Sequence, residues 1–317
     1  MDYEVAPMTK QKCYPEALKV SWPLPTGPLE ADKIARLRRR LPPRWHKHIQ
    51  PEVNSSALLT AELLKLPHHK LLEIPARDKF EDRQMHALAI KLYGKLREVG
   101  SIKAFQHVFV DCVECHYHAY LEGCVLHCDL SEGNLMFKVD AKDTVKGILN
   151  DWDMASYVDE NNEIKLSTAK HRTGTIPFMA RDLLVDEGTE PPPHLYRHDL
   201  ESFFYILVWA AFHYDFARKV QRPRTLAEFS AWDRESLLEA ALAKMGFIAS
   251  SRAKDPLFRR IPEDSKPLLP WMNSVWALFR DSDIAYEMNR NSPDRDDLTL
   301  GGHITFENFM KALGRTR

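Results

Sequence analysis

The stretch His127-Cys128-Asp129-Leu130-Ser131-Glu132-Gly133-Asn134, followed by Asp151-Trp152-Asp153, decides the fold of this 317-residue chain. A loop with an Asp, an Asn five positions later and another Asp after a short strand supplies the oxygen ligands that Mg²⁺ prefers. In phosphoryl transfer, the first Asp takes the proton of the attacking hydroxyl, while the Asn and the second Asp hold metal against the phosphates. A single His-x-Asp is more often a surface loop. The other segments of the chain therefore decide its meaning.

The composition is that of a folded protein, with 44% hydrophobic and 28% charged residues. Lys and Arg number 44 against 45 for Asp and Glu, so no global attraction to nucleic acid or to an anionic membrane is expected. No apolar run reaches the roughly 20 residues that a spanning helix needs. The N-terminus lacks the basic start and apolar middle of a secretory signal, so we expect an intracellular protein.

The cysteines raise the question of a metal or haem site. Cys112-x-x-Cys115-His116 has the spacing of haem attachment, and His118 could add a further ligand. The same residues also fall, with Phe105 and Phe109, at the three-and-four spacing of a buried helical face. We favour the helical face. The five cysteines are expected to be reduced thiols.

A basic cluster raises a similar question about nucleic acid. It could bind nucleic acid or act as a localisation signal. No second basic stripe accompanies it, so a solvated helix face is the better interpretation. The cluster consists of Arg36, Arg38, Arg39, Arg40, Arg44 and Lys47.

Periodicity predicts the order of elements along the chain. Alternation over 16–22 predicts a strand that carries Lys19, and good helix formers over 29–37 predict a helix. A polar run at 140–144 predicts a hairpin turn that brings Asp129 and Asp151 near each other. Further predictions are a strand at 85–92, a break at Tyr93-Gly94, a loop at 154–173, and helices at 105–120, 199–209, 269–288 and 305–313. A capping box at Thr225–Glu228 predicts the start of another helix. The apolar stripe of that helix would consist of Phe229, Trp232, Leu237, Leu238 and Ala241.

In this order, the segments resemble the protein kinase fold, and most closely the fungal-type protein kinase family. The resemblance runs from Lys19 to the end of the chain. The sequence motifs that carry the resemblance are His127-x-Asp129-Leu130-Ser131, Asp151-Trp152-Asp153, Arg172 to Ala180, and His198-Asp199-Leu200-Glu201-Ser202. The resemblance implies an α+β bilobal fold. A small β-rich lobe at 1–94, with the third strand, helix C and the hinge strand, would precede a large mainly helical lobe at 95–317.

The resemblance also implies roles for individual residues. Asp129 would be the catalytic base, Ser131 and Thr175 would complete the catalytic set, and Lys19 would pair with the phosphates of ATP. Asn134 and Asp151 would bind the nucleotide through Mg²⁺. Glu30 is the nearest candidate to pair with Lys19, and Glu52 and Glu62 are alternatives. Asp182 replaces the usual Glu at the end of the activation segment, and Asp199 would brace the catalytic loop from below.

Departures from the kinase pattern leave two functions open. The first Gly is Gly27, beyond Lys19, so we expect the Gly-rich phosphate loop to be missing and the small lobe to be incomplete. Cys128 replaces the usual Arg, so switching by phosphate on Ser167, Thr168 or Thr173 is not expected. The first hypothesis is ATP- and Mg²⁺-dependent transfer to protein Ser/Thr hydroxyls. The second is an impaired pseudokinase or truncated kinase that acts as an interaction module. Small-molecule phosphotransfer is a third reading, which the segment from Gly174 to Asp182 disfavours.

Overall fold

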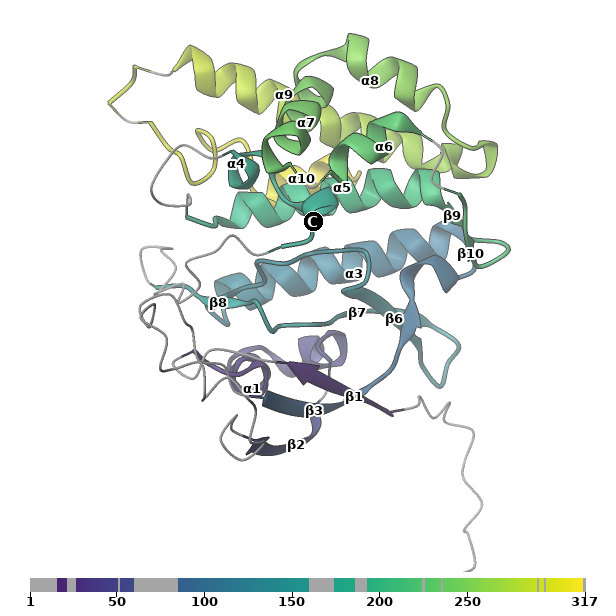
Figure 1. Cartoon of the computed structure of the whole chain (residues 1–317), viewed down its shortest axis with the longest axis vertical. Helices are drawn as coiled ribbons and strands as arrows, with labels where there is room; N and C mark the ends of the chain where they lie inside the picture. Colours follow the sequence, from purple (N-terminus) through teal and green to yellow (C-terminus); the bar gives the residue numbers. More distant parts are fainter. Residues whose placement is uncertain are drawn as a thin grey trace, which may run out of the picture.

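The computed structural model describes residues 16–21, 27–50, 52–59, 85–159, 174–185, 193–223, 226–234, 236–289, 291–293 and 295–315. These residues form helices and small antiparallel sheets, an α+β architecture. Strands β1 to β3 and helix α1 lie at one end of the molecule, and the helices α4 to α10 lie at the other (Figure 1). Helix α3 and strands β6 and β7 lie between them. Within the described residues, no helix is long and apolar enough to cross a bilayer.

The first sheet positions Lys19. Strand β3 (Met85–Lys91) lies in its middle, flanked by β1 (Glu16–Ser21) and β2 (Glu52–Leu59), and both pairings are antiparallel. Alternation along β1 leaves Leu18 and Val20 exposed at 67% and 49%, whereas the Lys19 side chain is only 21% exposed. The strands predicted at 16–22 and 85–92 are confirmed. The sequence pattern over 52–59 is too weak to have predicted β2.

Helix α1 (Glu30–Arg40) has charged residues on its buried face. The helix predicted at 29–37 is confirmed and extends three residues further. Its buried positions follow the three-and-four spacing of one helical face. Two of them carry charge, which is unusual for a buried face and requires polar partners. These buried residues are Glu30, Lys33, Ile34 and Leu37.

Helix α3 (Ile102–Leu121) contains the cysteine pair. It begins at the N-cap Ser101, whose hydroxyl accepts the Ala104 N–H at 3.1 Å, and it confirms the predicted helix at 105–120. Cys112 and Cys115 are fully buried, and burial raises the pKa of both thiols. These two cysteines therefore pack as small apolar residues on a helix face.

The predicted hairpin is confirmed. Strands β6 (Leu135–Val139) and β7 (Val145–Leu149) pair antiparallel. Asp140 closes the turn because its Oδ1 accepts the N–H groups of Lys142 and Thr144, both at 2.9 Å. This hairpin places Asn134 and Asp151 at its open end, where the two strands meet the loops that carry the site.

Helix α5 (Tyr196–His213) is the most deeply buried helix of the described chain. All its residues from His198 to His213 are buried. A helix that is apolar on every side belongs inside a domain, as the run at 199–209 had predicted.

The predicted helix after Thr225 is wrong in detail. Two helices replace it, α6 (Ala227–Trp232) and α7 (Leu237–Ala249). Thr225 lies outside the described residues, and Leu226 occupies the N-cap of α6. Ser236 caps α7 by accepting the Glu239 N–H at 3.3 Å. The break between the helices shifts the phase of the apolar stripe, so Leu238 is 54% exposed instead of buried.

The helices predicted at 269–288 and 305–313 are confirmed as α9 (Leu269–Met288) and α10 (Phe306–Ala312). Much of the loop predicted at 154–173, including Ser167, Thr168 and Thr173, lies outside the described residues. The remaining described elements are η1 (Pro43–His48), β4 (Gly94–Lys95), η3 (Leu96–Glu98), β5 (Val125–Leu126), β8 (Ser156–Tyr157), η4 (Ile176–Phe178), α4 (Arg181–Leu184), β9 (Tyr214–Asp215), β10 (Val220–Gln221), α8 (Ser251–Phe258), η5 (Glu263–Leu268), α9 (Leu269–Met288) and α10 (Phe306–Ala312).

Candidate active site

The loop after β5 holds Asp129 and Asn134 together. The Asn134 side-chain amide donates to the Asp129 carbonyl at 2.7 Å, and the Asn134 N–H donates to the Ser131 carbonyl at 3.1 Å. Ser131 is buried at 8% exposure. The first bond uses the side-chain nitrogen of Asn134 and the second uses its backbone nitrogen. The side-chain oxygen of Asn134 therefore remains available to a cation.

Asp199 braces this loop from α5. Its Oδ2 accepts the Cys128 N–H at 3.2 Å and lies 2.7 Å from His116 Nε2, while its Oδ1 lies 2.7 Å from His194 Nε2. Burial opposes the charged form, yet His194 and His116 hold the pKa of Asp199 far below its usual range. The carboxylate stays ionised and so remains a strong acceptor for the Cys128 N–H. Cys128 itself has a φ of 65°, a left-handed conformation that this bond helps to hold.

Asp151 lies beside the same loop. The Asn150 N–H donates to the Asn134 carbonyl at 2.9 Å, and His127 Nε2 lies 2.9 Å from the Asn150 carbonyl. Asp151 has a φ of 62°, the second left-handed residue of the site. Non-glycine residues with positive φ are uncommon and concentrate at functional sites. The two sequence motifs therefore meet at adjacent backbones.

Lys19 of β1 and Glu30 of α1 lie beside Asp151. Lys19 Nζ lies 2.5 Å from Glu30 Oε2 and 2.6 Å from Asp151 Oδ1. Burial opposes the charge on Lys19, but the carboxylates of Glu30 and Asp151 outweigh it and raise its pKa. Burial likewise opposes the charge on Asp151, and Lys19 nevertheless holds its pKa below the usual value. Of the alternatives to Glu30, Glu62 and the side chain of Glu52 lie outside the described part of the chain.

Side chains of helix α1 also form hydrogen bonds with the backbone of the Asp-Trp-Asp triplet at 151–153. Glu30 Oε1 accepts the Trp152 N–H at 2.9 Å, and Lys33 Nζ donates to the Asp153 carbonyl at 2.5 Å. The Asp153 carboxylate lies 3.6 Å from Lys19 Nζ. Sequence reasoning missed Lys33 and Asp153. The available signal was that Lys33 follows Glu30 by three residues, which places both on one helical face.

Thr175 closes the site over Asp129. Its N–H and its hydroxyl both donate to Asp129 Oδ1 at 3.0 Å. Gly174 has a φ of 146°, and a Cβ there would lie 2.8 Å from Met179 Cγ. The backbone before Thr175 thus needs glycine for its conformation, and the Met179 side chain would have to shift to admit a Cβ.

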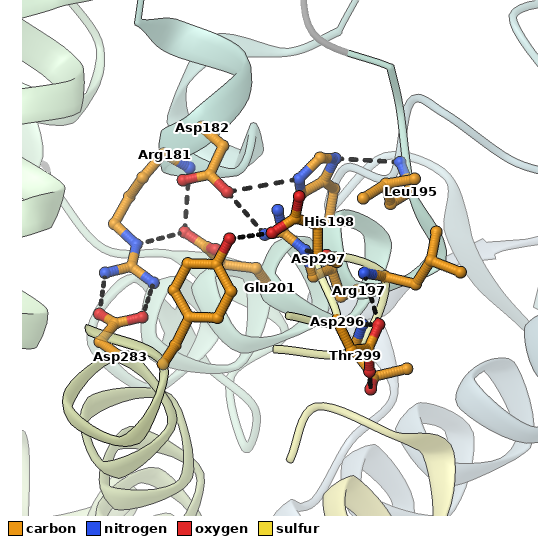
Figure 2. Close-up of polar contacts among 12 residues, drawn as sticks. Arg181, Asp182, Leu195, Arg197, His198, Glu201, Asp283, Asp296, Asp297 and Thr299 are labelled. Carbon is orange, nitrogen blue, oxygen red and sulfur yellow. Dashed lines mark hydrogen bonds and ion pairs between the residues drawn. The ribbon is translucent and has the colours of Figure 1, made fainter. Parts of the chain in front are cut away.

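Ion pairs fix the position of α4, which follows Thr175 and η4 in the chain (Figure 2). Arg181 lies 2.9 Å from Glu201 and 2.5 Å from Asp283, so it joins α4 to α5 and α9. Asp182, the expected substitute for a Glu, pairs with Arg197 at 2.6 Å. Burial opposes its charge, but His198 and Arg197 lower the pKa of Asp182 well below the usual range.

The oxygen-rich donor set fits Mg²⁺. Carboxylate oxygens of Glu30, Asp151 and Asp153 lie within 4.8 Å of one another, the one such group among the described residues, and Lys19 Nζ lies within ion-pair distance of all three. Hard divalent cations prefer carboxylate and amide oxygens, which Asp151 and Asn134 offer. Asn134 is joined to the residue before Asp151 by the backbone bond described above.

Comparison with protein families finds a match that covers much of the chain. Residues 27–211, more than half of the chain, match the model of a family described as fungal protein kinase. The matched residues include Glu30, Asp129, Asn134 and Asp151, whereas Lys19 precedes them. A comparison with curated proteins finds no match.

Proposed function

Because the chain belongs to the fungal protein kinase family, we propose that it transfers the γ-phosphoryl group of ATP to a Ser or Thr hydroxyl of a protein substrate. The observation that carries the proposal is the contact between Lys19 and Asp151, which are 132 residues apart. It brings a cation suited to nucleotide phosphates beside a loop that offers Asp129 and Asn134. We further propose that 1–94 and 95–317 form the smaller and larger lobes of a bilobal kinase.

Asp129 takes the proton of the acceptor hydroxyl in this proposal. General bases act on a proton within hydrogen-bond reach, and positioning of the base matters as much as its pKa. Two bonds from Thr175 hold one Asp129 oxygen, which leaves the other oxygen for the acceptor. Thr175 would therefore orient the base, and the buried Ser131 would support the loop through its carbonyl.

Lys19 binds phosphate oxygens in this proposal, held in place by Glu30. Asn134 and Asp151 would hold Mg²⁺, which supplies neutralisation of the negative charge on the phosphates. Burial opposes the charge on Lys19, but the carboxylates of Glu30 and Asp151, with a smaller contribution from Asp153, raise its pKa, so its interaction with phosphate persists over the whole physiological pH range. The arrangement separates a proton-accepting end at Asp129 from a phosphate-binding end at Lys19.

Thermal unfolding with and without ATP and Mg²⁺ tests the nucleotide half of the proposal. A ligand that binds only the folded state raises its melting temperature. We expect a rise at millimolar nucleotide, and a smaller rise in Asp151→Asn. No rise for the wild type would contradict the enzyme proposal and favour an interaction module without catalysis.

Asp129→Asn tests the catalytic half. We expect the variant to retain the thermal shift and to lose phosphoryl transfer to a generic Ser/Thr protein substrate by about 100-fold or more, the contribution typical of a general base. Loss of the thermal shift together with activity would mean that the role assigned to Asp129 is wrong.

A further inference from the structure

Lys244 is a fully buried lysine that the proposed chemistry does not use. It lies on α7 with 0% exposure. Its Nζ donates to the Ile176 carbonyl at 2.7 Å and to the Met179 carbonyl at 2.6 Å. The Nζ also lies 4.4 Å from the centre of the Tyr205 ring. A residue of α7 thus holds both ends of η4, the short helix that follows Thr175.

Hydrogen bonding explains why a lysine occupies this position. The Ile176 carbonyl also accepts the Met179 N–H at 3.3 Å within the turn, whereas the Met179 carbonyl lies past the end of η4, where the turn itself supplies no N–H donor. Burial lowers the pKa of Lys244 to about 7, with Glu201 opposing this shift and Arg181 adding to it. A neutral amine keeps two N–H groups, one for each carbonyl. The two bonds therefore persist whether or not the amine is protonated.

The turn that Lys244 holds also positions Thr175. The Thr175 carbonyl accepts the N–H groups of Phe178 at 2.8 Å and Met179 at 3.1 Å. On its other side, Thr175 makes the two bonds to Asp129 described above. A continuous series of hydrogen bonds thus runs from Lys244 through η4 and Thr175 to Asp129.

The packing around η4 supports the same path. Met179 and Ala180 form a small apolar cluster with Leu183, Leu184, Ala240 and Ala241, which joins the segment to α4 and α7. Apolar packing alone restrains this segment without specifying where its carbonyls point. Hydrogen bonds from Lys244 supply that direction.

We propose that Lys244 is a positioning residue, which fixes η4 and through Thr175 the orientation of Asp129 toward the acceptor hydroxyl. This inference rests on the proposed kinase function. It assigns to α7 a part in substrate phosphorylation, although no residue of α7 touches Asp129 in the described contacts.

The test replaces Lys244 by methionine, which has nearly the same length and no N–H donor. We expect kcat for a protein substrate to fall about 10- to 100-fold, the effect typical of a misplaced catalytic group. The thermal shift with ATP and Mg²⁺ should remain, because Lys19 and Asp151 are untouched. Hydrogen exchange at the Phe178 and Met179 amides should become faster. Ile248→Val, also buried on α7, is the matched control and should leave kcat and this exchange unchanged.

A Lys244→Met protein with wild-type kcat and wild-type exchange at Phe178 and Met179 would overturn the inference. If the wild type itself transfers no phosphate, that result counts against the proposed function, and the exchange rates alone decide the role of Lys244. If Lys244→Met does not fold, exchange in the wild type decides. Protected Phe178 and Met179 amides would support the restraint, and rates equal to those of an unstructured peptide would refute it.

Discussion

Glu30 links three parts of the site through a single side chain. One carboxylate oxygen faces Lys19, and the other accepts the Trp152 N–H. Burial raises the pKa of Glu30 more than Lys19 lowers it, and the neighbouring Asp151 and Asp153 add to the rise. Attraction to Lys19 therefore competes with repulsion from the nearby carboxylates of Asp151 and Asp153. The hydrogen bond to the Trp152 N–H gives Glu30 a second function.

Two substitutions at Glu30 separate these functions. Glu30→Gln keeps an oxygen for the Trp152 N–H but removes the charge that faces Lys19. Glu30→Ala removes both, and an unsatisfied buried N–H costs about 1–3 kcal/mol. We expect urea unfolding to show Glu30→Ala as the less stable variant by about that amount, and both variants to show a smaller thermal shift with ATP and Mg²⁺.

Glu52→Gln is the control for this prediction. Because Lys19 pairs with Glu30, the control should keep the thermal shift of the wild type. Equal stability of Glu30→Gln and Glu30→Ala would show that the Trp152 bond contributes nothing. A reduced shift in the control alone would mean that Glu52 is the functional partner of Lys19.

At the scale of elements, the hairpin that carries Asp151 packs directly on α3. A Cβ at Gly147 of β7 would lie 2.5 Å from the Val108 carbonyl and 2.7 Å from Asp111 Cβ, both on α3. The Gly147 N–H donates to Asp111 Oδ2 at 2.8 Å, which fixes the approach of strand to helix. Glycine is required here for close contact between backbones, because no other residue leaves enough space.

Gly147→Ala should therefore separate β7 from α3. Overpacking of this kind lowers the free energy of unfolding by about 1–3 kcal/mol. Urea unfolding measures the change. Gly246→Ala on α7 is the opposite case, because its Cβ would meet no atom within 4 Å. In a helix, that change should raise the free energy of unfolding by about 0.5–1 kcal/mol. A stabilised Gly147→Ala protein would contradict this close packing of β7 on α3.

At the scale of the whole molecule, buried histidines make stability depend on pH. Burial lowers the pKa of His198 from 6.5 to about 4, although Asp182 opposes the shift. Between these values the unfolded chain binds a proton that the folded protein does not. Stability must therefore fall as the pH drops from 6.5 toward 4, by up to about 1.4 kcal/mol per pH unit for this one group.

His198→Asn should flatten that dependence. In the wild type, the Leu195 N–H donates to His198 Nδ1 at 3.0 Å. Asn at position 198 keeps an acceptor for this N–H. We expect the difference in unfolding free energy between wild type and variant to shrink steadily from pH 6.5 to 5. Urea unfolding at several pH values measures it. His107→Asn, whose side chain is 48% exposed, should follow the wild-type curve. Parallel curves for the wild type and His198→Asn would contradict the burial effect.

The sequence by itself determined most of the elements and the family. Period and turn chemistry are local, so the helix at 105–120 and the hairpin around 140–144 could be predicted from neighbouring residues alone. The same holds for the motifs with Asp129, Asn134 and Asp151, whose spacing along the chain carries the resemblance to kinases. The strand β2 and the break between α6 and α7 were missed, because weak patterns there are overridden by packing against distant segments.

Only the tertiary structure decided which residues meet. Lys19, Glu30 and Asp151 are brought within ion-pair distance by the packing of β1 and α1 against the end of the hairpin, and no local pattern encodes that contact. The same is true of Lys33, Asp153 and Lys244. Their partners are backbone carbonyls or charges of remote segments, and a buried charge finds such partners only after the chain has folded around it.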